Sequence, residues 1–424
     1  MKVLVIAEAA NPDWVSVPLV GWSLANSLRK VVDTHLVTQI RNTAAITKYG
    51  LIENQDFTAI NSEKFAKPVF KIANFIRGGK NKGWTLMTAA SALSYYYFEY
   101  CVWKRFGKDI KSGKYDLVHR VTPLSPTVPS FLAKKCNKHG VKFILGPLNG
   151  GVPWPVGFDS SRRKEKEYLS YIRNAYKMMP GYRSTITHSA AIIAGSSYTL
   201  GQLPSKFNDK YFYIPENGIN PDKFSSRAKP IKDGVLRACF VGRLVPYKGP
   251  DMLLEAALPL LTTGKLELDI IGDGPLMHTL KAFVKTHNLE NCVSLHGWVE
   301  HSLVQDVMIN SQVLAFPSIR EFGGGVVLEA MALGIVPLVI DYAGPGDLVT
   351  QETGYKVALG TRGEIISGVR SGLNNVLSKQ STLPIMAQRC IDLIKQKFYW
   401  DVKAQQVAEI YRWALDNDEP KPKF

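Results

Sequence analysis

The sequence has few cysteines, no long apolar segment and a shortage of acidic side chains. The five cysteines are scattered and form no CxxC pair: Cys101, Cys136, Cys239, Cys292 and Cys390. This pattern argues against a disulfide framework and a structural zinc site, and it favours the reducing cytoplasm. No uncharged apolar run reaches about eighteen residues, so we expect no membrane-spanning helix. Residues 1–8 have too short an apolar region for a secretory signal and indicate a first strand.

The charge balance is the most informative bulk property. Lysine and arginine number 52 against 36 aspartates and glutamates, which gives a formal net charge of +16. Such a charge favours anionic partners, namely nucleotide phosphates, anionic lipid headgroups, acidic glycans or nucleic acid.

A basic stretch, 64–82, contains six cations and no acid, interleaved with phenylalanines, and the aromatic run 95–98 follows it. Two interpretations stay open for this region. It is either a solvated loop before an aromatic core helix, or a face that lies on an anionic membrane. Nucleic acid is the weaker option, because no known binding module accompanies the basic stretch.

Strand-like and helix-like segments alternate from the start, with a strand at 2–7, a helix at about 19–30 and a strand at 35–39. This order predicts an α/β protein with parallel, doubly wound sheets. A chain of 424 residues exceeds one hydrophobic core, so we expect two or three domains. The glycine fingerprint of a dinucleotide-binding first turn is missing, since only Gly21 is available, and this disfavours a dehydrogenase.

Two features of the first half are candidate site residues. His119 ends an apolar stretch, and ligands of open α/β sheets collect outside the carboxyl ends of strands. A strand-end histidine bonded to the backbone is the alternative. Asn149 precedes Gly150 and Gly151, which allow either close backbone approach to a ligand or only a tight turn.

In the second half, the apolar strand 313–316 leads to Glu321, Phe322 and three glycines before a helix-like segment, 326–333. Bare backbone amides at the positive end of a helix hold phosphate groups well. Glu321 stands at the mouth of this turn and Glu329 in the expected first helical turn. An ordinary strand–helix connection, with an acid where acids are favoured, is the alternative.

Two further loops follow predicted strands at 236–241 and 266–271. The first carries Arg243 and Lys248 before a helix at about 250–261, a pair that suits a diphosphate. The second, 272–275, is an incomplete dinucleotide fingerprint because Met277 occupies the third glycine's place. In a parallel sheet these loops and the triple-glycine turn should meet along one edge.

These three loops and an earlier segment, 214–220, are similar in their order to signatures of the retaining glycosyltransferases of family 4. Residues 214–220 (IPENGIN) resemble the I-P-N-G-V-D linker of the family, with Glu216 as an extra residue. Residues 242–249 (GRLVPYKG) resemble its G-R-L-x-x-x-K-G loop, and residues 272–275 (GDGP) match G-x-G-P. Glu321 with Glu329 matches E-x7-E.

The resemblance spans nearly the whole chain and implies the GT-B fold: α/β, two Rossmann-like doubly wound domains that face each other across a cleft. We expect an acceptor-binding domain over 1–215, a linker over 216–234 and a nucleotide-sugar-binding domain over 235–398. A C-terminal helix and tail, 399–424, should pack back on the first domain.

The resemblance also implies a donor site. Its expected residues are Gly242, Gly272, Gly274, Phe322, Gly323, Gly324, Gly325, Val326 and Glu329. Arg243 and Lys248 would hold the diphosphate of the donor and stabilise it as it leaves, and Glu329 would accept both ribose hydroxyls.

The reacting sugar has its own implied contacts. Glu321 would touch the donor sugar near its reacting face, and His119 matches the histidine of the amino-terminal domain that approaches it. Together with Arg243 and Lys248 they form the expected catalytic set, while 149–151 are the acceptor-side candidates. No metal and no other cofactor is implied, because two cations and a helix terminus supply the positive charge and no Asp-x-Asp cluster occurs near these loops.

Two departures from the family pattern affect specificity. After the first glutamate the usual order is glycine, phenylalanine, glycine, whereas here Phe322 precedes the three glycines, which puts donor preference in doubt. The glycine pair of the first strand–helix loop is replaced by 17–21 (VPLVG), so contacts made from there cannot be carried over.

The sequence therefore predicts a retaining, hexosyltransferase-type enzyme that moves a sugar from a nucleotide diphosphate sugar to a hydroxyl, in polysaccharide, lipopolysaccharide or glycolipid synthesis. We expect it in the cytoplasm, with a peripheral place on the inner face of the membrane left open, and without nucleic acid as a partner. A nucleotide-sugar epimerase, a phosphorylase-like enzyme or a non-catalytic partner in a glycan assembly complex are the alternatives.

Overall fold

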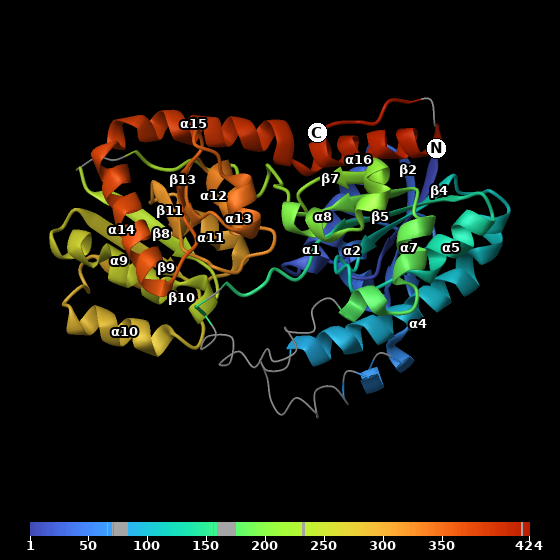
Figure 1. The fold of residues 1–424 in the computed structure, drawn as a ribbon, viewed down its shortest axis with the longest axis horizontal. Helices are drawn as coiled ribbons and strands as arrows, with labels where there is room; N and C mark the ends of the chain where they lie inside the picture. The colour runs from blue at the N-terminus through green and yellow to red at the C-terminus, as the bar shows by residue number, and fades with distance from the viewer. Residues whose placement is uncertain are drawn as a thin grey trace. The chain divides into compact units, whose positions relative to one another are not determined.

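The computed structural model describes residues 1–65, 67–69, 71, 84–155, 157–158, 175–230, 234–416 and 419–424. The chain forms two compact units, each built around a parallel sheet with helices on both faces (Figure 1). The first unit comprises Met1–Gly151, Arg163–Glu216 and Trp400–Phe424, and the second comprises Val152–Arg162 and Asn217–Tyr399. This confirms the prediction of an α/β protein with two doubly wound sheets.

The first unit contains a seven-stranded sheet in the order β3-β2-β1-β4-β5-β6-β7. Its strands are β1 (Lys2–Ala7), β2 (Asp33–Gln39), β3 (Phe57–Ile60), β4 (Leu117–Thr122), β5 (Lys142–Leu148), β6 (Ala191–Ala194) and β7 (Tyr211–Tyr213). The central strands β1, β4 and β5 are buried over almost their whole length, although β4 includes the polar residues His119, Arg120 and Thr122. Such burial is expected where helices cover both faces of a parallel sheet. In β1, Val3 to Ala7 are fully buried.

The helices of the first unit are α1 (Val17–Leu28), α2 (Thr43–Lys48), α4 (Trp84–Lys111), α5 (Phe131–Lys138), α7 (Tyr182–His188), α8 (Ser197–Gln202) and α16 (Trp400–Leu415). The last of these, α16, packs beside α1 and buries Trp400, Val407, Ile410 and Tyr411 in the core on that face of the sheet. This confirms the prediction that the C-terminal helix returns to the first domain.

The second unit contains a six-stranded parallel sheet in the order β10-β9-β8-β11-β12-β13. Its strands are β8 (Leu236–Val241), β9 (Leu266–Ile271), β10 (Val293–Gly297), β11 (Val313–Phe316), β12 (Val336–Ile340) and β13 (Tyr355–Val357). Its helices are α9 (Pro250–Thr262), α10 (Met277–Thr286), α11 (His301–Met308), α12 (Gly325–Ala332), α13 (Ala343–Leu348), α14 (Arg362–Ser378) and α15 (Leu383–Leu393), which a π-helical turn, Ile394–Phe398, extends.

In each sheet the strand order reverses beside the first strand, between β1 and β4 in the first unit and between β8 and β11 in the second, as in Rossmann domains. The reversal separates the loops of neighbouring strands at their carboxyl ends and opens a place for a ligand there. In the second unit this point lies between β8 and β11, the strands that precede the basic loop and the triple-glycine turn.

The expected linker, 216–234, belongs to the second unit from Asn217 onward. Phe224 is buried in the core of that unit, and the amide of Ala228 donates to the carbonyl of Leu333 at 2.8 Å. A buried apolar side chain and backbone hydrogen bonds therefore attach this segment to the second unit, although its polar composition predicted an interdomain linker. Residues 152–155 also join the second unit, although they follow β5 of the first.

Candidate active site

The basic loop after β8 and the glycine loop after β9 are joined backbone to backbone. The amide of Gly242 donates to Ile271 at 3.0 Å, and the amide of Leu244 donates to Asp273 at 3.0 Å. A Cβ on Gly272 would lie 2.0 Å from the carbonyl oxygen of Gly242, so only glycine permits this approach.

The segment after β11 joins the same group of loops. The Ile319 amide and the Ser318 hydroxyl both donate to the carbonyl of Tyr247, at 3.0 and 3.3 Å. The three loops therefore meet at one sheet edge, as their spacing predicted, and the meeting point is the switch point of the sheet.

Lys248 and Glu321 form an ion pair at this meeting point. Each side chain is 18% exposed, and the lysine ammonium lies 5.2 Å from the centre of the Phe316 ring. Burial lowers the pKa of Lys248 to about 8. Arg243, the second predicted cation, is exposed on the same loop.

The triple-glycine turn starts helix α12. Gly324 is its N-cap with a φ of 60°, a left-handed conformation that glycine adopts without strain. The first amides of a helix have no partner within the helix, so those of Gly325 and Val326 are available to an anion. A Cβ on Gly325 would lie 3.6 Å from the Asn217 side-chain nitrogen, which places this amide beside the same terminus.

Glu329 lies in the second turn of α12, not in the first turn as predicted, because the helix begins at Gly325. Its Oε1 is 3.0 Å from Nε2 of His301, the first residue of α11. The hydrogen bond to Glu329 raises the pKa of His301, and burial opposes this effect.

The short segment 152–155 packs against the Glu321 loop. Arg320 is only 8% exposed, and its guanidinium carbon lies 5.0 Å from the Trp154 ring centre and 5.5 Å from that of Phe322. The Tyr342 hydroxyl donates to the Pro153 carbonyl at 3.0 Å. These contacts hold the residues on both sides of Glu321.

The prediction that His119 lies at the carboxyl edge of its strand is wrong, because β4 continues to Thr122. His119 is fully buried, with Nδ1 2.5 Å from the Tyr411 hydroxyl and Nε2 2.6 Å from the Gly146 carbonyl oxygen. The carbonyl requires a proton on Nε2, so Nδ1 accepts from Tyr411 and the ring is neutral. Burial is the main cause that lowers its pKa, to about 4. In this structure His119 ties α16 to the sheet.

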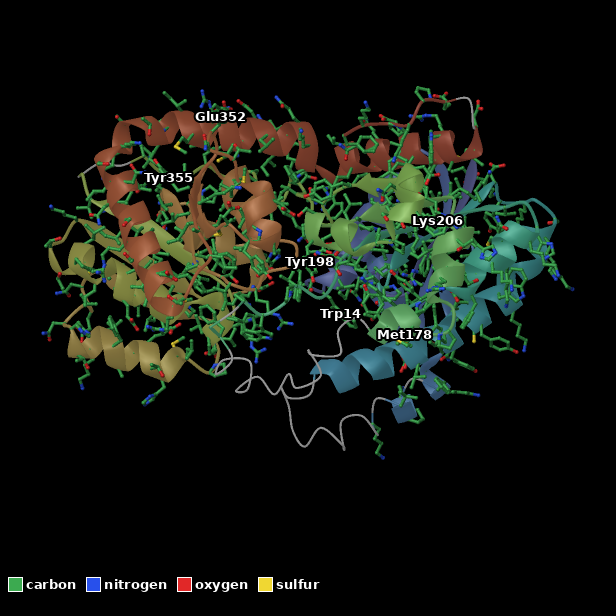
Figure 2. All side chains as sticks on the ribbon, in the orientation of Figure 1. Trp14, Met178, Tyr198, Lys206, Glu352 and Tyr355 are labelled. Carbon is green, nitrogen blue, oxygen red and sulfur yellow. The ribbon has the colours of Figure 1, made fainter. Side chains whose placement is uncertain are left out.

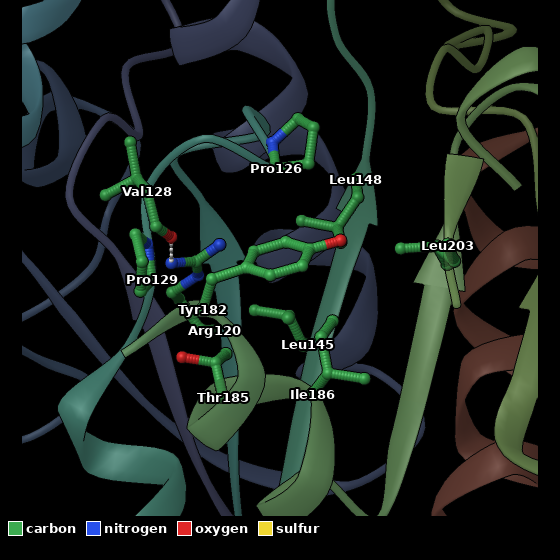
Figure 3. Close-up of a pocket in the computed structure, with 10 residues that line it drawn as sticks. All are labelled: Arg120, Pro126, Val128, Pro129, Leu145, Leu148, Tyr182, Thr185, Ile186 and Leu203. Carbon is green, nitrogen blue, oxygen red and sulfur yellow. Dashed lines mark hydrogen bonds between the residues drawn. The ribbon is translucent and has the colours of Figure 1, made fainter. Parts of the chain in front are cut away.

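Arg120, the next residue of β4, points to the opposite face of the sheet. Its Nη1 donates to the Val128 carbonyl at 2.5 Å beside a small cavity, whose ten lining residues Figure 3 shows. The cavity holds about 10 Å³, which is room for about one water molecule and too little for a substrate.

The acceptor-side candidates, 149–151, directly follow β5 and pack closely against neighbouring segments. Asn149 is buried, and its Oδ1 accepts from the Ser196 hydroxyl at 3.0 Å. Gly150 leaves room for Pro126, since a Cβ there would lie 2.6 Å from the proline ring. A role for Asn149, Gly150 and Gly151 in acceptor binding stays a prediction.

Sequence reasoning missed three neighbours of the site: His301, Asn217 and Arg320. Asn217 belongs to the 214–220 motif, and that motif could have indicated that Asn217 lies near the triple-glycine turn. His301 precedes Glu329 by 28 positions and contacts it only through the fold, so no local pattern could have found it.

Residues 222–382 match the family model described as glycosyl transferases group 1. A 2-deoxystreptamine N-acetyl-D-glucosaminyltransferase from Niallia circulans is 28% identical over 37% of this chain and 40% of its own length. An uncharacterized glycosyltransferase from Methanocaldococcus jannaschii is 24% identical over 72% of this chain and 76% of its own.

A solved structure has the same fold. The crystal structure of a glycosyltransferase from Rickettsia africae superposes with a TM-score of 0.63 at 14% identity, covering 98% of this chain and 99% of that one. With the two Rossmann-type sheets, this likeness identifies the GT-B fold. The part of the chain that matches the glycosyl transferases group 1 model, residues 222–382, contains the three loops that meet at the candidate site.

Proposed function

We propose that this protein is a retaining glycosyltransferase that moves a hexose-type sugar from a nucleotide diphosphate sugar to a hydroxyl acceptor. One observation carries the proposal: Lys248, Glu321 and Glu329 converge with the amino end of α12 at the switch point of a Rossmann sheet. The name of the Niallia relative, an N-acetyl-D-glucosaminyltransferase, supports a hexosamine or hexose as the transferred group.

The positive groups of the site suit the charge that develops on the leaving group. Lys248 supplies a point charge, Arg243 a forked donor, and the α12 amides oriented dipoles. Such preorganised donors stabilise a departing diphosphate more strongly in a site with little water. Glu329 would accept the ribose hydroxyls.

The reaction we propose is a front-face displacement. The bond from the anomeric carbon to the phosphate oxygen breaks, the acceptor oxygen bonds to the same face, and the acceptor proton passes to the departing phosphate. A covalent intermediate would need a carboxylate nucleophile. Glu321 is paired with Lys248 in the ligand-free chain, and the resemblance to the retaining glycosyltransferases of family 4 is what favours the front-face route over a nucleophilic role for this carboxylate.

We also propose that the reaction needs no metal, since the two cations and the helix amides neutralise the diphosphate. Turnover in excess EDTA should equal turnover with added Mg²⁺ or Mn²⁺. A loss of activity on chelation that either ion restores would contradict this part of the proposal.

We propose that the acceptor lies at an anionic membrane surface. The enzyme would then act in polysaccharide, lipopolysaccharide or glycolipid synthesis at the inner face of the membrane. Leu93 and Tyr100 of α4 are 54% and 57% exposed, and Phe131 of α5 is 48% exposed. Exposed cations of the same two helices accompany them: Lys104, Arg105, Lys108, Lys134 and Lys138. The unit also exposes Trp14 and Met178 (Figure 2). Most of the basic stretch 64–82 lies outside the described residues.

No helix among the described residues is long and apolar enough to cross a bilayer. We propose that these cations and exposed apolar side chains attach the chain to the membrane surface.

Product analysis with radiolabelled nucleotide diphosphate sugars tests the function. Transfer to an acceptor with retained configuration is the expected result, and Lys248→Ala should slow it by orders of magnitude without unfolding the protein. Conversion of the donor sugar without any acceptor would identify an epimerase instead. Binding of donors without any turnover would indicate a non-catalytic partner.

A further inference from the structure

His301 occupies a fixed place beside Glu329. It is the first residue of α11 and follows directly on Glu300, the N-cap of that helix. Its ring lies edge-on to Phe224, with the ring centres 5.9 Å apart, and Phe224 itself is buried in the core of the second unit. The imidazole is 33% exposed, so packing on one side and the carboxylate on the other restrict its rotation.

The pair uses only half of the carboxylate. His301 Nε2 contacts Oε1 of Glu329 at 3.0 Å. Within the part of the chain that the structure describes, Oε2 accepts no hydrogen bond. A carboxylate has about four lone-pair sites, so the group keeps acceptor capacity on both oxygens after it has bound the imidazole.

A vicinal diol needs two acceptors at a fixed separation and in one plane. The terminal torsion of a glutamate is broad, so an isolated carboxylate rotates and must be ordered when the ligand binds. A donor that holds Oε1 removes this freedom in advance. The fixed carboxylate should therefore strengthen the binding of a diol, whose two hydroxyls both reach it. A ligand with one hydroxyl fewer should gain less affinity from the same preorganisation.

We propose that His301 is a positioning residue that fixes the Glu329 carboxylate for the 2′,3′-diol of a ribonucleotide, so that the pair makes this chain discriminate against 2′-deoxyribonucleotides. This inference rests on the proposed function, because it assumes that a nucleoside diphosphate moiety binds at this site. It adds a residue, and a selectivity, that no sequence motif of the chain indicates.

The test is calorimetric binding of UDP, GDP and ADP and of their 2′-deoxy forms to the whole chain. For the base that binds best, the wild type should prefer the ribonucleotide by about 10- to 100-fold, since one hydrogen bond to a charged group is lost in the deoxy form. His301→Ala should weaken ribonucleotide binding by about tenfold and leave deoxyribonucleotide binding nearly unchanged, so that the ratio falls by about tenfold.

His301→Gln provides the rescue, because its side-chain amide places an N–H donor near the position of Nε2 and should restore most of the ratio. His287→Ala is the matched control, since His287 lies at the C-terminal end of α10, where it stacks on Phe283 and contacts the carbonyl of the same residue. Its ratio should equal that of the wild type.

Each other result has a distinct meaning. If His301→Ala weakens both nucleotide forms equally, or changes neither, or if glutamine fails to restore a lost ratio in a folded variant, the positioning role is overturned while the proposed function stands. If the wild type binds none of these nucleoside diphosphates, the proposed function itself fails and takes this inference with it.

Discussion

Lys248 is the residue on which the chemistry of the site depends most. In the ligand-free chain its ammonium is paired with Glu321, and its pKa is lowered by burial to about 8. A bound diphosphate offers the ammonium a more highly charged partner than a single carboxylate. In the proposed donor complex, a phosphate would replace the Glu321 carboxylate as the partner of Lys248.

The lowered pKa predicts a pH dependence. Below about pH 8 the Lys248 ammonium is charged and attracts the diphosphate, and as pH rises through 8 the charge and the affinity are lost. Affinity of the wild type for a nucleoside diphosphate should therefore fall between pH 7 and pH 9.5. Lys248→Arg should flatten this fall, because a guanidinium stays charged above pH 12. Calorimetric titrations across this range measure both profiles, and equal slopes for the two proteins would contradict the assignment.

At this scale the sequence predicts a residue best when a short motif places it. Lys248 and Glu321 follow strands with clear apolar patterns, so their positions at the sheet edge were predictable. The predicted strand end at His119 was wrong because the buried strand continues through Arg120 and Thr122, whose polar side chains are not typical of a strand interior. His301 had no local signal, because its partner lies on another element.

Among the elements, the turn before α12 has the most demanding geometry. Gly324 adopts a φ of 60°, and a Cβ there would also lie 2.8 Å from the Leu348 side chain. The turn is thus fixed by backbone conformation and by the packing of α13 against it.

Gly324→Ala should destabilise the protein by about 1–3 kcal/mol, the cost of a left-handed conformation for a residue with a Cβ. Binding of nucleoside diphosphates should weaken as well, because the α12 amides shift. Gly363→Ala in α14 is the matched control, since open space surrounds that glycine and the helix favours alanine. Thermal unfolding and calorimetric binding measure both effects, and equal melting temperatures for the two variants would refute the geometric argument.

Element bounds were largely predictable because the second unit alternates short apolar strands with glycine-rich turns. The strands expected at 236–241, 266–271 and 313–316 have those bounds in the structure. The packing of 152–155 on the Glu321 loop was not predictable, because an arginine between two aromatic rings depends on residues far apart in sequence.

For the whole molecule, the net charge of +16 is the property that sequence composition gives directly. The aromatic region was left open between a core helix and a membrane face, and in the structure Tyr95 and Phe98 are buried in the core whereas Tyr100 is 57% exposed. Two units were predictable because the chain exceeds one hydrophobic core, and the return of α16 to the first unit was what the family resemblance implied. The position at which the chain passes from one unit to the other was not predictable. The segment from Asn217 onward joins the second unit through contacts that composition does not encode.

The net positive charge and the exposed side chains of Leu93, Tyr100 and Phe131 predict salt-dependent binding to anionic vesicles. The chain should float with vesicles containing phosphatidylglycerol at low ionic strength and detach at high salt, where counterions screen the surface. Replacing Lys104, Lys108 and Lys134 by glutamate should abolish flotation while leaving nucleotide binding intact. An absence of binding at low salt, or equal binding to neutral vesicles, would contradict the membrane proposal.

The most direct test of the central claim is a crystal structure of the whole chain with a nucleoside diphosphate bound. We predict that the terminal phosphate accepts hydrogen bonds of about 2.7–3.2 Å from Lys248 and from the first amides of α12, with the ribose on Glu329. A diphosphate seated anywhere else, with the Lys248–Glu321 pair still intact, would contradict the assignment of this sheet edge as the donor site.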